Sequence, residues 1–375
     1  MKPIYLDYNA TTPIDPEVVE AMHPYLTGYF GNPSSNHQYG KPAKLAIEQA
    51  REQIANLINC KSNEIVFTSG GTESNNYAII GTAYHLNSKG NHIITSIIEH
   101  PAVTEVCRYL ETQGFEISYL PVNKLGEVSL DNLQRTIKPS TILISIMHAN
   151  NEIGTLQPIN EIGEIAKKHG ICFHTDAAQT IGKVAVDVQL MGVDLLSITG
   201  HKFYAPKGVG ALYIKENIIL QKLMHGANHE NNRRPGTENV LSIVGFGKAA
   251  EIVKRDFKKN YTHQFNLREL LFQKLKEKNP NLQLNGHPEK RLPNTLSVGF
   301  PNKDASEILS KTEGIAASTG SACHSDKMQV SNVLKAINLP THLAKGTIRF
   351  STGKFLNHLD IEKAAILIND AISIG

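Results

Sequence analysis

From residue 64 to residue 214, short apolar runs alternate with longer segments in which apolar and polar residues mix. Each apolar run is too brief for a helix and ends in small or polar residues, which is typical of a buried β-strand. The predicted strands cover residues 64–68, 92–97, 117–121, 141–147, 171–175, 195–198 and 210–214. Strands that alternate with helices predict an α/β fold with a mostly parallel central sheet covered on both faces.

Two helical segments carry clear signals. Apolar residues at positions 47, 50, 54, 57 and 58 recur at three- and four-residue steps, which predicts a helix with one buried face. A second helix is predicted over residues 159–169, where Gly170 supplies a C-terminal cap.

The pattern changes at the charged stretch of residues 254–262, which we interpret as exposed helix surface at a domain junction. The elements predicted beyond it form a smaller α+β unit. They are a helix with leucines at 267, 270, 271 and 275, a strand at 295–300, a helix capped by Asp304, a strand at 347–351 and a last helix from Asp360. We therefore expect a large domain of residues 15–255 and a small domain of residues 1–14 and 256–375.

Composition excludes several classes of function. A net charge of +3 provides no broad field for nucleic acid or membrane, and no apolar run approaches the ~18 residues that span a bilayer. The four cysteines are scattered without a Cys-x-x-Cys pair, so neither disulfides nor a zinc ribbon is expected and a reducing, cytoplasmic setting is predicted. The histidines show no metal-ligand spacing, so we expect no metal.

Ligands of open α/β sheets bind beyond the carboxyl ends of the strands, so the residues that follow each strand are the candidates for chemistry. Lys202 follows the strand at 195–198. A lysine held against a buried wall has its pKa lowered by desolvation and becomes an amine nucleophile. Taken alone, Lys202 is more simply explained as one of many solvated lysines.

Residues at the ends of other predicted strands favour a functional role for Lys202. Asp176 ends a nearly continuous apolar strand, where a carboxylate calls for a cationic partner such as the protonated ring nitrogen of pyridoxal phosphate. Gly70, Gly71 and Thr72 precede a helix, whose first N–H groups suit a phosphate. His100 follows another strand and can stack on a flat ligand. Together with Lys202, these residues offer a partner to every part of pyridoxal phosphate.

Nine segments, in this order, are similar to the fold-type I pyridoxal-phosphate enzymes of the class V aminotransferase group. Within that group the chain most resembles the cysteine desulfurases and their relative selenocysteine lyase. The segments are 6–13 (LDYNATTP), 31–35 (GNPSS), 67–76 (FTSGGTESNN), 150–152 (NNE), 174–179 (HTDAAQ), 200–202 (GHK), 234–239 (RPGTEN), 318–323 (STGSAC) and 348–351 (IRFS).

The resemblance implies roles for the residues around the cofactor. Lys202 would hold pyridoxal 5'-phosphate covalently, Asp176 would pair with its ring nitrogen, and Gln179 with its phenolic oxygen. His100 would stack on the ring and take part in proton transfers, and Asn151 would lie beside cofactor and substrate. The implied phosphate ligands are Gly71, Thr72, Thr199 and His201.

The resemblance also implies the partners. In the family the threonine of the Arg-Pro-Gly-Thr segment reaches the phosphate of the neighbouring subunit, so Thr237 implies a homodimer. Arg349 would bind the carboxylate of the substrate, L-cysteine or L-selenocysteine, with its planar fork. A sulfur-acceptor or scaffold protein would be the macromolecular partner.

Cys323 is the implied nucleophile. Its surroundings, residues 318–325, are small and polar, which is typical of a mobile loop with nothing to bury the thiol. Its thiolate would attack the sulfur of the substrate, leaving a persulfide on Cys323 and releasing alanine. We expect Cys60, Cys107 and Cys172 to be buried spacers.

Three alternatives remain at this point. A selenocysteine lyase is favoured by the segments at 232–237 and 322–326, and would depend less on Cys323. An aminotransferase or β-lyase is possible because the fold hosts many reactions. A non-catalytic scaffold for a sulfur-accepting partner is the alternative of another class. One departure also stands out: residues 226–230 read GANHE where desulfurases usually show Gly-Gly-Gly-Gln-Glu.

Overall fold

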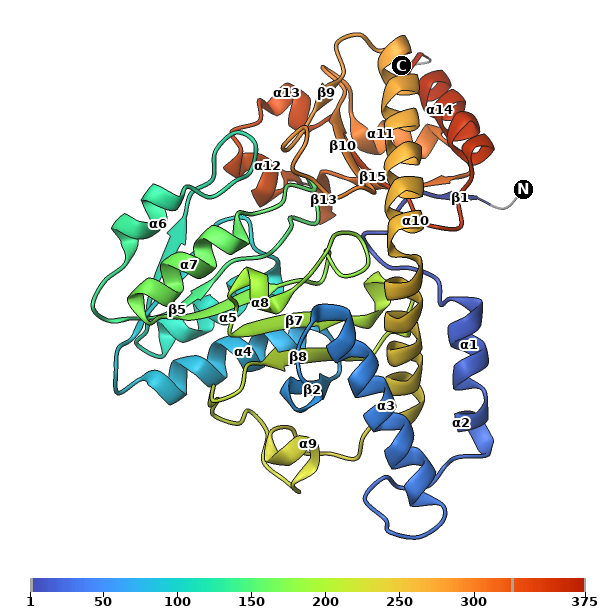
Figure 1. The fold of residues 1–375 in the computed structure, drawn as a ribbon. Helices are drawn as coiled ribbons and strands as arrows, with labels where there is room; N and C mark the ends of the chain where they lie inside the picture. The colour runs from blue at the N-terminus through green and yellow to red at the C-terminus, as the bar shows by residue number, and fades with distance from the viewer. Residues whose placement is uncertain (1–2, 325–326, 374–375) are drawn as a thin grey trace.

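The computed structural model describes residues 3–324 and 327–373, and for residues 321–324 and 327–329 it describes the backbone alone. The described residues form two larger β-sheets and two short two-stranded ones, and one long helix runs past both larger sheets (Figure 1).

The larger sheet has seven strands in the order β2-β8-β7-β6-β5-β3-β4. The five strands from β7 to β4 are parallel to one another, whereas β8 is antiparallel to both of its neighbours. All seven predicted strands are present, with ends that differ from the prediction by a residue or two. Their bounds are β2 Ile65–Thr68, β3 His92–Ser96, β4 Glu116–Leu120, β5 Thr141–Ser145, β6 Cys172–Asp176, β7 Leu195–Thr199 and β8 Gly210–Ile214.

Helices cover both faces of this sheet because most of its strands are apolar on both sides. In β2, Ile65 and Phe67 enter one core while Val66 enters the other. The first core is completed by α3 (Gly40–Ile58), α7 (Ile159–His169) and the first half of α10 (Val240–Lys278). The second is completed by α4 (Gly71–Leu86) and α5 (Pro101–Thr112). The predicted helices over residues 47–58 and 159–169 are confirmed, with Gly170 in the left-handed conformation as cap.

The second sheet has four strands in the order β12-β15-β10-β9 and a separate apolar core. Its strands are β9 Gln283–Leu284, β10 Thr295–Gly299, β12 Ser318–Thr319 and β15 Thr347–Ser351. Helix α11 (Ala305–Lys311) is capped by Asp304 as predicted, since its carboxylate accepts from Ser306 and Glu307.

The start of the last helix is a correction. Helix α14 spans His358–Ser373 and begins two residues before the predicted Asp360. Asn357 accepts a hydrogen bond from the Asp360 N–H at 3.0 Å, and Asp360 accepts one from the Asn357 N–H at 2.9 Å. Asn357 is therefore the cap, and Asp360 is the third helical residue of a reciprocal capping pair.

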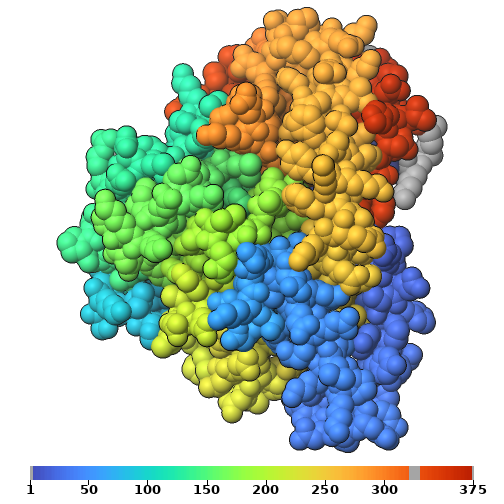
Figure 2. Space-filling view, in the orientation of Figure 1, coloured from blue at the N-terminus to red at the C-terminus, as the bar shows by residue number. Residues whose placement is uncertain are grey.

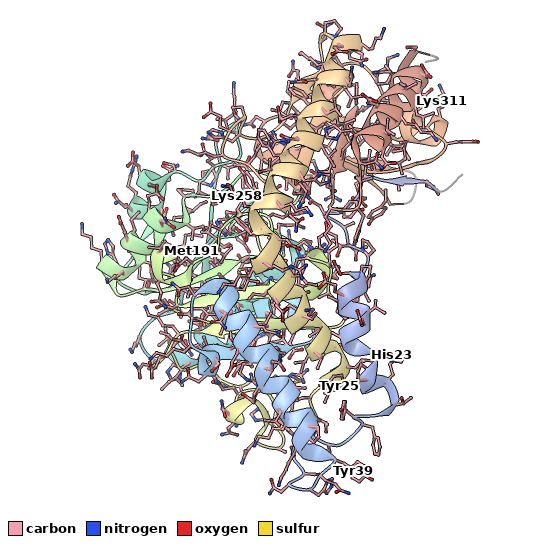
Figure 3. The ribbon with its side chains drawn as sticks, turned by 45° about the vertical axis from the view of Figure 1, so that its right-hand side comes forward. His23, Tyr25, Tyr39, Met191, Lys258 and Lys311 are labelled. Atoms are coloured by element: carbon pink, nitrogen blue, oxygen red, sulfur yellow. The ribbon has the colours of Figure 1, made fainter. Side chains whose placement is uncertain are left out.

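Helix α10 links the two cores as one continuous element of 39 residues. Residues of its first half, such as Phe246, lie in the core of the large sheet, and Leu267, Leu271 and Leu275 lie in the core of the small one. The predicted exposed stretch at 254–262 is its middle, where Figure 3 labels Lys258. Helices α3 and α10 lie side by side on the surface in Figure 2.

Several short elements carried no clear sequence signal. Strand β1 (Ile4–Tyr5) pairs in parallel with β11 (Ile315–Ala316) in a two-stranded sheet of its own. An isolated bridge between Asp7 and Ser351 of β15 ties the N-terminal segment to the smaller sheet. The segment around Cys323, predicted as a loop, has the backbone of a hairpin in which β13 (Ser321–His324) pairs with β14 (Lys327–Val330). The other helices are α1 Pro16–Met22, α2 Pro24–Thr27, α6 Leu130–Thr136, α8 Val188–Met191, α9 His229–Asn232, α12 Asn332–Ala336 and α13 Thr341–Ala344. Among the described residues, no helix is both long and apolar enough to cross a membrane.

Candidate active site

A cavity of about 330 Å³ opens beyond the carboxyl ends of β6 and β7, at the place where an open α/β sheet binds its ligand. Ten residues singled out from the sequence line it together, although they come from segments up to 278 positions apart. They are Gly71, Thr72, His100, Asn151, Asp176, Gln179, Thr199, His201, Lys202 and Arg349.

Lys202 reaches this cavity from a single 3₁₀ turn, residues 200–202, that directly follows β7. Its Nζ donates hydrogen bonds of 2.7 Å to the backbone oxygens of Asn9 and of Ala10. Burial, followed by the positive charge of Arg349, lowers the pKa of Lys202 to about 8. A substantial fraction of the amine is therefore neutral near physiological pH, as a nucleophile or proton acceptor requires.

Asp176 lies at the end of β6, beside β7, and is only 7% exposed. Its Oδ2 accepts a hydrogen bond of 2.7 Å from Nδ2 of Asn75, and its Oδ1 accepts one of 2.8 Å from the Ala178 N–H. No ion pair of Asp176 occurs among the residues that the structure describes. A buried carboxylate that faces a cavity without a cation fits a ligand that brings the positive charge.

Helix α4 begins at Gly71 and directs its N-terminus at the same cavity. Gly70, just before it, has φ +150°, a backbone conformation that glycine adopts without strain. His201 lines this side, with Nδ1 3.2 Å from the hydroxyl of Thr11. Burial and the neighbouring Lys202 lower the pKa of His201 to about 4, so its imidazole is neutral and can donate one N–H. A helix start with a neutral donor beside it suits a phosphate.

His100 forms the N-cap of α5 and faces the cavity. Its Nδ1 accepts a hydrogen bond of 3.1 Å from the Ala102 N–H, which fixes the tautomer with the proton on Nε2. Burial lowers the pKa of His100, so the neutral form predominates. This imidazole can lie on a ring and donate or accept a proton at Nε2.

Arg349, on β15, brings the smaller sheet into the site. One of its terminal nitrogens donates to Oδ1 of Asp7 at 2.7 Å, and the other donates to the backbone oxygen of Asn151 at 3.1 Å. Its buried Nε has no hydrogen-bond partner among the described residues. An arginine at the cavity wall whose Nε–H is unused suits an anionic group such as a carboxylate.

Gln179 connects the cavity to residues that sequence reasoning did not assign. Its Nε2 donates a hydrogen bond of 3.1 Å to the backbone oxygen of Asn9, the oxygen that also accepts from Lys202. Asn9, Ala10, Asp7 and Asn75 all lie in segments that carried the family resemblance. Asn9 and Ala10 act through their backbone, so side-chain chemistry provided no signal for them. The polar Asn75 on the face of α4 that packs on the sheet was a signal for a buried partner.

One predicted cofactor-binding residue, Thr237, does not line this cavity. Thr237 lines a different one, of about 240 Å³, together with Arg234 and Gly208. Cys323 has its backbone in β13, paired with Met328, and its side chain lies outside the residues whose side chains the structure describes.

The cavity fits pyridoxal phosphate at three separate points. The aldehyde requires a neutral amine, the ring nitrogen requires a buried carboxylate, and the phosphate requires N–H donors at a helix start. Lys202, Asp176 and the first turn of α4 provide them around one cavity. The fold and the site therefore define a pyridoxal-phosphate enzyme.

The aminotransferase class-V family model matches residues 4–363, and the chain belongs to this family. It is similar to the cysteine desulfurase IscS of Dictyoglomus turgidum, with 51% identity over 360 residues that cover 96% of this chain and 91% of the relative. Among solved structures, a NifS-like protein superposes over 100% of both chains with a TM-score of 0.94 and 36% identity. A structure described as SspA in complex with cysteine is 39% identical, with a TM-score of 0.84 over 94% of this chain and 99% of the other.

Proposed function

We propose that this protein is a pyridoxal-phosphate-dependent cysteine desulfurase, which converts L-cysteine to L-alanine and leaves the sulfur as a persulfide on Cys323. The observation that carries the proposal is the cavity shared by Lys202, Asp176 and Arg349 in a chain similar to IscS over nearly its full length. The cysteine in the related SspA structure supports cysteine as the substrate.

The chain's own residues then have distinct roles. Bound pyridoxal phosphate supplies an electron sink that acidifies the Cα proton of the substrate. Arg349 orients the substrate carboxylate, and Asn151 lies beside it. The Nζ of Lys202 accepts the Cα proton, a task that suits a pKa of about 8. His100 donates or accepts at Nε2.

Sulfur transfer completes the reaction. The thiolate of Cys323 attacks the substrate sulfur, so an S–S bond forms while the C–S bond breaks and its electron pair moves to carbon. Protonation of that carbon yields alanine. One cysteine and one thiol thus give one alanine and one persulfide, and no external oxidant or reductant is needed.

A homodimer is part of the proposal. Thr237 lies outside the cavity of its own chain, which fits a residue that completes the site of a second copy. Large apolar side chains are also exposed over α2 and the segment before α3, including Phe30 at 71% and Leu26 at 60%. Figure 3 places Tyr25 and Tyr39 at this same end of the molecule. A second copy would cover this surface.

The remaining parts of the proposal concern organisation and setting. The two sheets and their separate cores support a large domain of residues 15–255 and a small domain of residues 1–14 and 256–375 that carries Cys323. The free thiols of Cys60, Cys107 and Cys172 suit a reducing compartment, the cytoplasm. A sulfur-acceptor protein would take the persulfide sulfur for iron-sulfur clusters or thiolated products.

The decisive experiment gives the purified holoenzyme L-cysteine and L-selenocysteine in parallel, with alanine, sulfide and selenide measured. We expect stoichiometric alanine from cysteine, with sulfur retained on the protein until a reductant is added. Cleavage of selenocysteine alone would identify a selenocysteine lyase, and a keto-acid product would identify an aminotransferase or β-lyase. A protein that stays colourless with added pyridoxal phosphate would instead be a scaffold.

A further inference from the structure

Lys183 is a buried lysine to which the reaction assigns no role. It is only 5% exposed, and its Nζ donates a buried hydrogen bond of 2.9 Å to Oε1 of Gln179. The turn that follows β6 directs it inward, and Gly182 makes this possible. At Gly182 φ is +79°, and a Cβ there would lie 3.1 Å from Val253 and 3.3 Å from Phe203. The fold therefore places this lysine behind the cavity wall.

The hydrogen bonds around Gln179 fix the orientation of its carboxamide. The backbone oxygen of Asn9 can only accept, so the group of Gln179 that faces it at 3.1 Å must be the NH₂. The carbonyl oxygen then points to Lys183, which is the donor it needs. An NH₂ group has two hydrogens, and only one is used by Asn9. The second is available to the cavity that Gln179 lines.

We propose that Lys183 is a positioning residue, which holds the Gln179 carboxamide so that its second N–H faces the phenolic oxygen of the bound cofactor. The inference rests on the role proposed for Gln179 in the site. The same chain of contacts continues to the reactive amine, because the Asn9 oxygen that accepts from Gln179 also accepts from Lys202 at 2.7 Å. Lys183 is thus linked to Lys202 by hydrogen bonds that pass through Gln179 and the backbone oxygen of Asn9.

A neutral amine suits this position better than a charged one. Burial, followed by the charges of Lys202 and Arg349, lowers the pKa of Lys183 well below its ordinary value. A neutral amine can fix the amide through one N–H without adding a positive charge beside Lys202 and Arg349. Without Lys183, the Gln179 oxygen would lose its donor and the carboxamide would be free to rotate.

The test is a double-mutant cycle read from the visible absorption of the bound cofactor as a function of pH. A donor to the phenolic oxygen stabilises its anionic form, so losing the donor raises the pKa of the spectral change. We expect Q179A to raise this pKa by about half a pH unit or more, and K183M to shift it in the same direction. In the double variant, the shift should equal that of Q179A alone, because Lys183 acts through Gln179. K168M, at an exposed lysine of α7, is the matched control.

Each outcome of this experiment tests a different part of the proposal. An unshifted spectrum in Q179A would overturn the proposed contact of Gln179 and the inference with it. A shift in Q179A with none in K183M, or shifts that add in the double variant, would overturn the role of Lys183 alone. K183L removes the same donor but has a different apolar shape. A spectral shift shared by K183M and K183L therefore reflects the lost donor and not altered packing. If both Lys183 variants fail to fold, or lose thermal stability without a spectral shift, Lys183 serves folding and the inference is wrong.

Discussion

Asn75 donates a hydrogen bond of 2.7 Å from its Nδ2 to Oδ2 of Asp176, and both side chains are buried. The carboxylate that faces the cavity is thus held by a residue on α4, the helix whose first turn suits the phosphate. The two ends of the proposed cofactor site are therefore coupled through one helix, and a change in its position would affect both.

The first prediction concerns this pair. D176A removes the partner of the ring nitrogen, so we expect turnover of cysteine to fall by about 10³-fold or more, since the electron sink is lost. N75A leaves the carboxylate with the Ala178 N–H as its remaining donor among the described contacts, and a fall of about tenfold is expected. Initial rates of alanine formation measure both. Half-buried Asn76, the next residue on α4, has no hydrogen bond to Asp176 among the described contacts and provides the control N76A. Equal losses in N75A and N76A would contradict the pairing.

The second prediction concerns the pH dependence of Lys202. Its pKa is lowered to about 8, and only the neutral amine attacks the cofactor aldehyde. As pH rises through 8 the neutral fraction increases, so the rate at which cofactor-free protein recombines with pyridoxal phosphate should rise and then level off. The growth of visible absorbance measures this rate. An inflection near the ordinary lysine value of about 10.4 would show that burial does not tune this amine. K202A should form no covalent link.

Some features of this site could be predicted from the sequence and others could not. The strands were predictable because each apolar run is short and bounded, and the strand ends then place Asp176 beside Lys202. The hydrogen bonds of Lys202 to Asn9 and Ala10 could not be predicted, because every residue type has a backbone oxygen. The contact with Asn9 also joins positions 193 residues apart. Arg349 required the smaller sheet to be docked against the larger one. Periodicity along the chain contains no information on that placement.

The third prediction separates Cys323 from the other cysteines. C323A should abolish alanine release from cysteine, with a fall of about 100-fold or more, because no thiolate remains to take the sulfur. Burial raises the pKa of Cys60 to about 12, so that thiol stays protonated near neutral pH. C60A should therefore stay within about twofold of the parent. Alanine and protein-bound sulfane sulfur are the quantities to measure. Full turnover by C323A would rule out the persulfide mechanism.

The fourth prediction tests whether Thr237 acts across a dimer. A mixture of K202A and T237V subunits, refolded or exchanged together, contains hybrids in which one site has both native residues. If Thr237 serves the neighbouring subunit, activity should recover to about a quarter of the parent in an equal mixture, the value set by random pairing. If it serves its own chain, no site in the hybrid is intact and no recovery occurs. Sedimentation of the same samples establishes the oligomeric state.

The fifth prediction concerns the segment that departs from the family pattern, residues 226–230. Glu230 ends it in a buried, two-pronged ion pair with Arg51, at 2.7 and 2.8 Å, and also accepts from the Phe67 N–H at 2.8 Å. The side chains of Arg51 and Glu230 are 7% and 3% exposed.

Removing one partner of such a pair leaves a buried charge uncompensated, so E230Q and R51M should each lower the free energy of unfolding by about 3 kcal/mol. The double variant R51M/E230L should recover much of this loss, because it leaves no lone charge behind. Urea unfolding followed by circular dichroism measures the effect. H229Q, which restores the usual family residue next to Glu230, is the control and should change stability little, since His229 is half-buried and its Nδ1 only accepts from the Gly236 N–H at 3.2 Å. Equal stability of E230Q and the parent would show that the ion pair does not hold this segment in place.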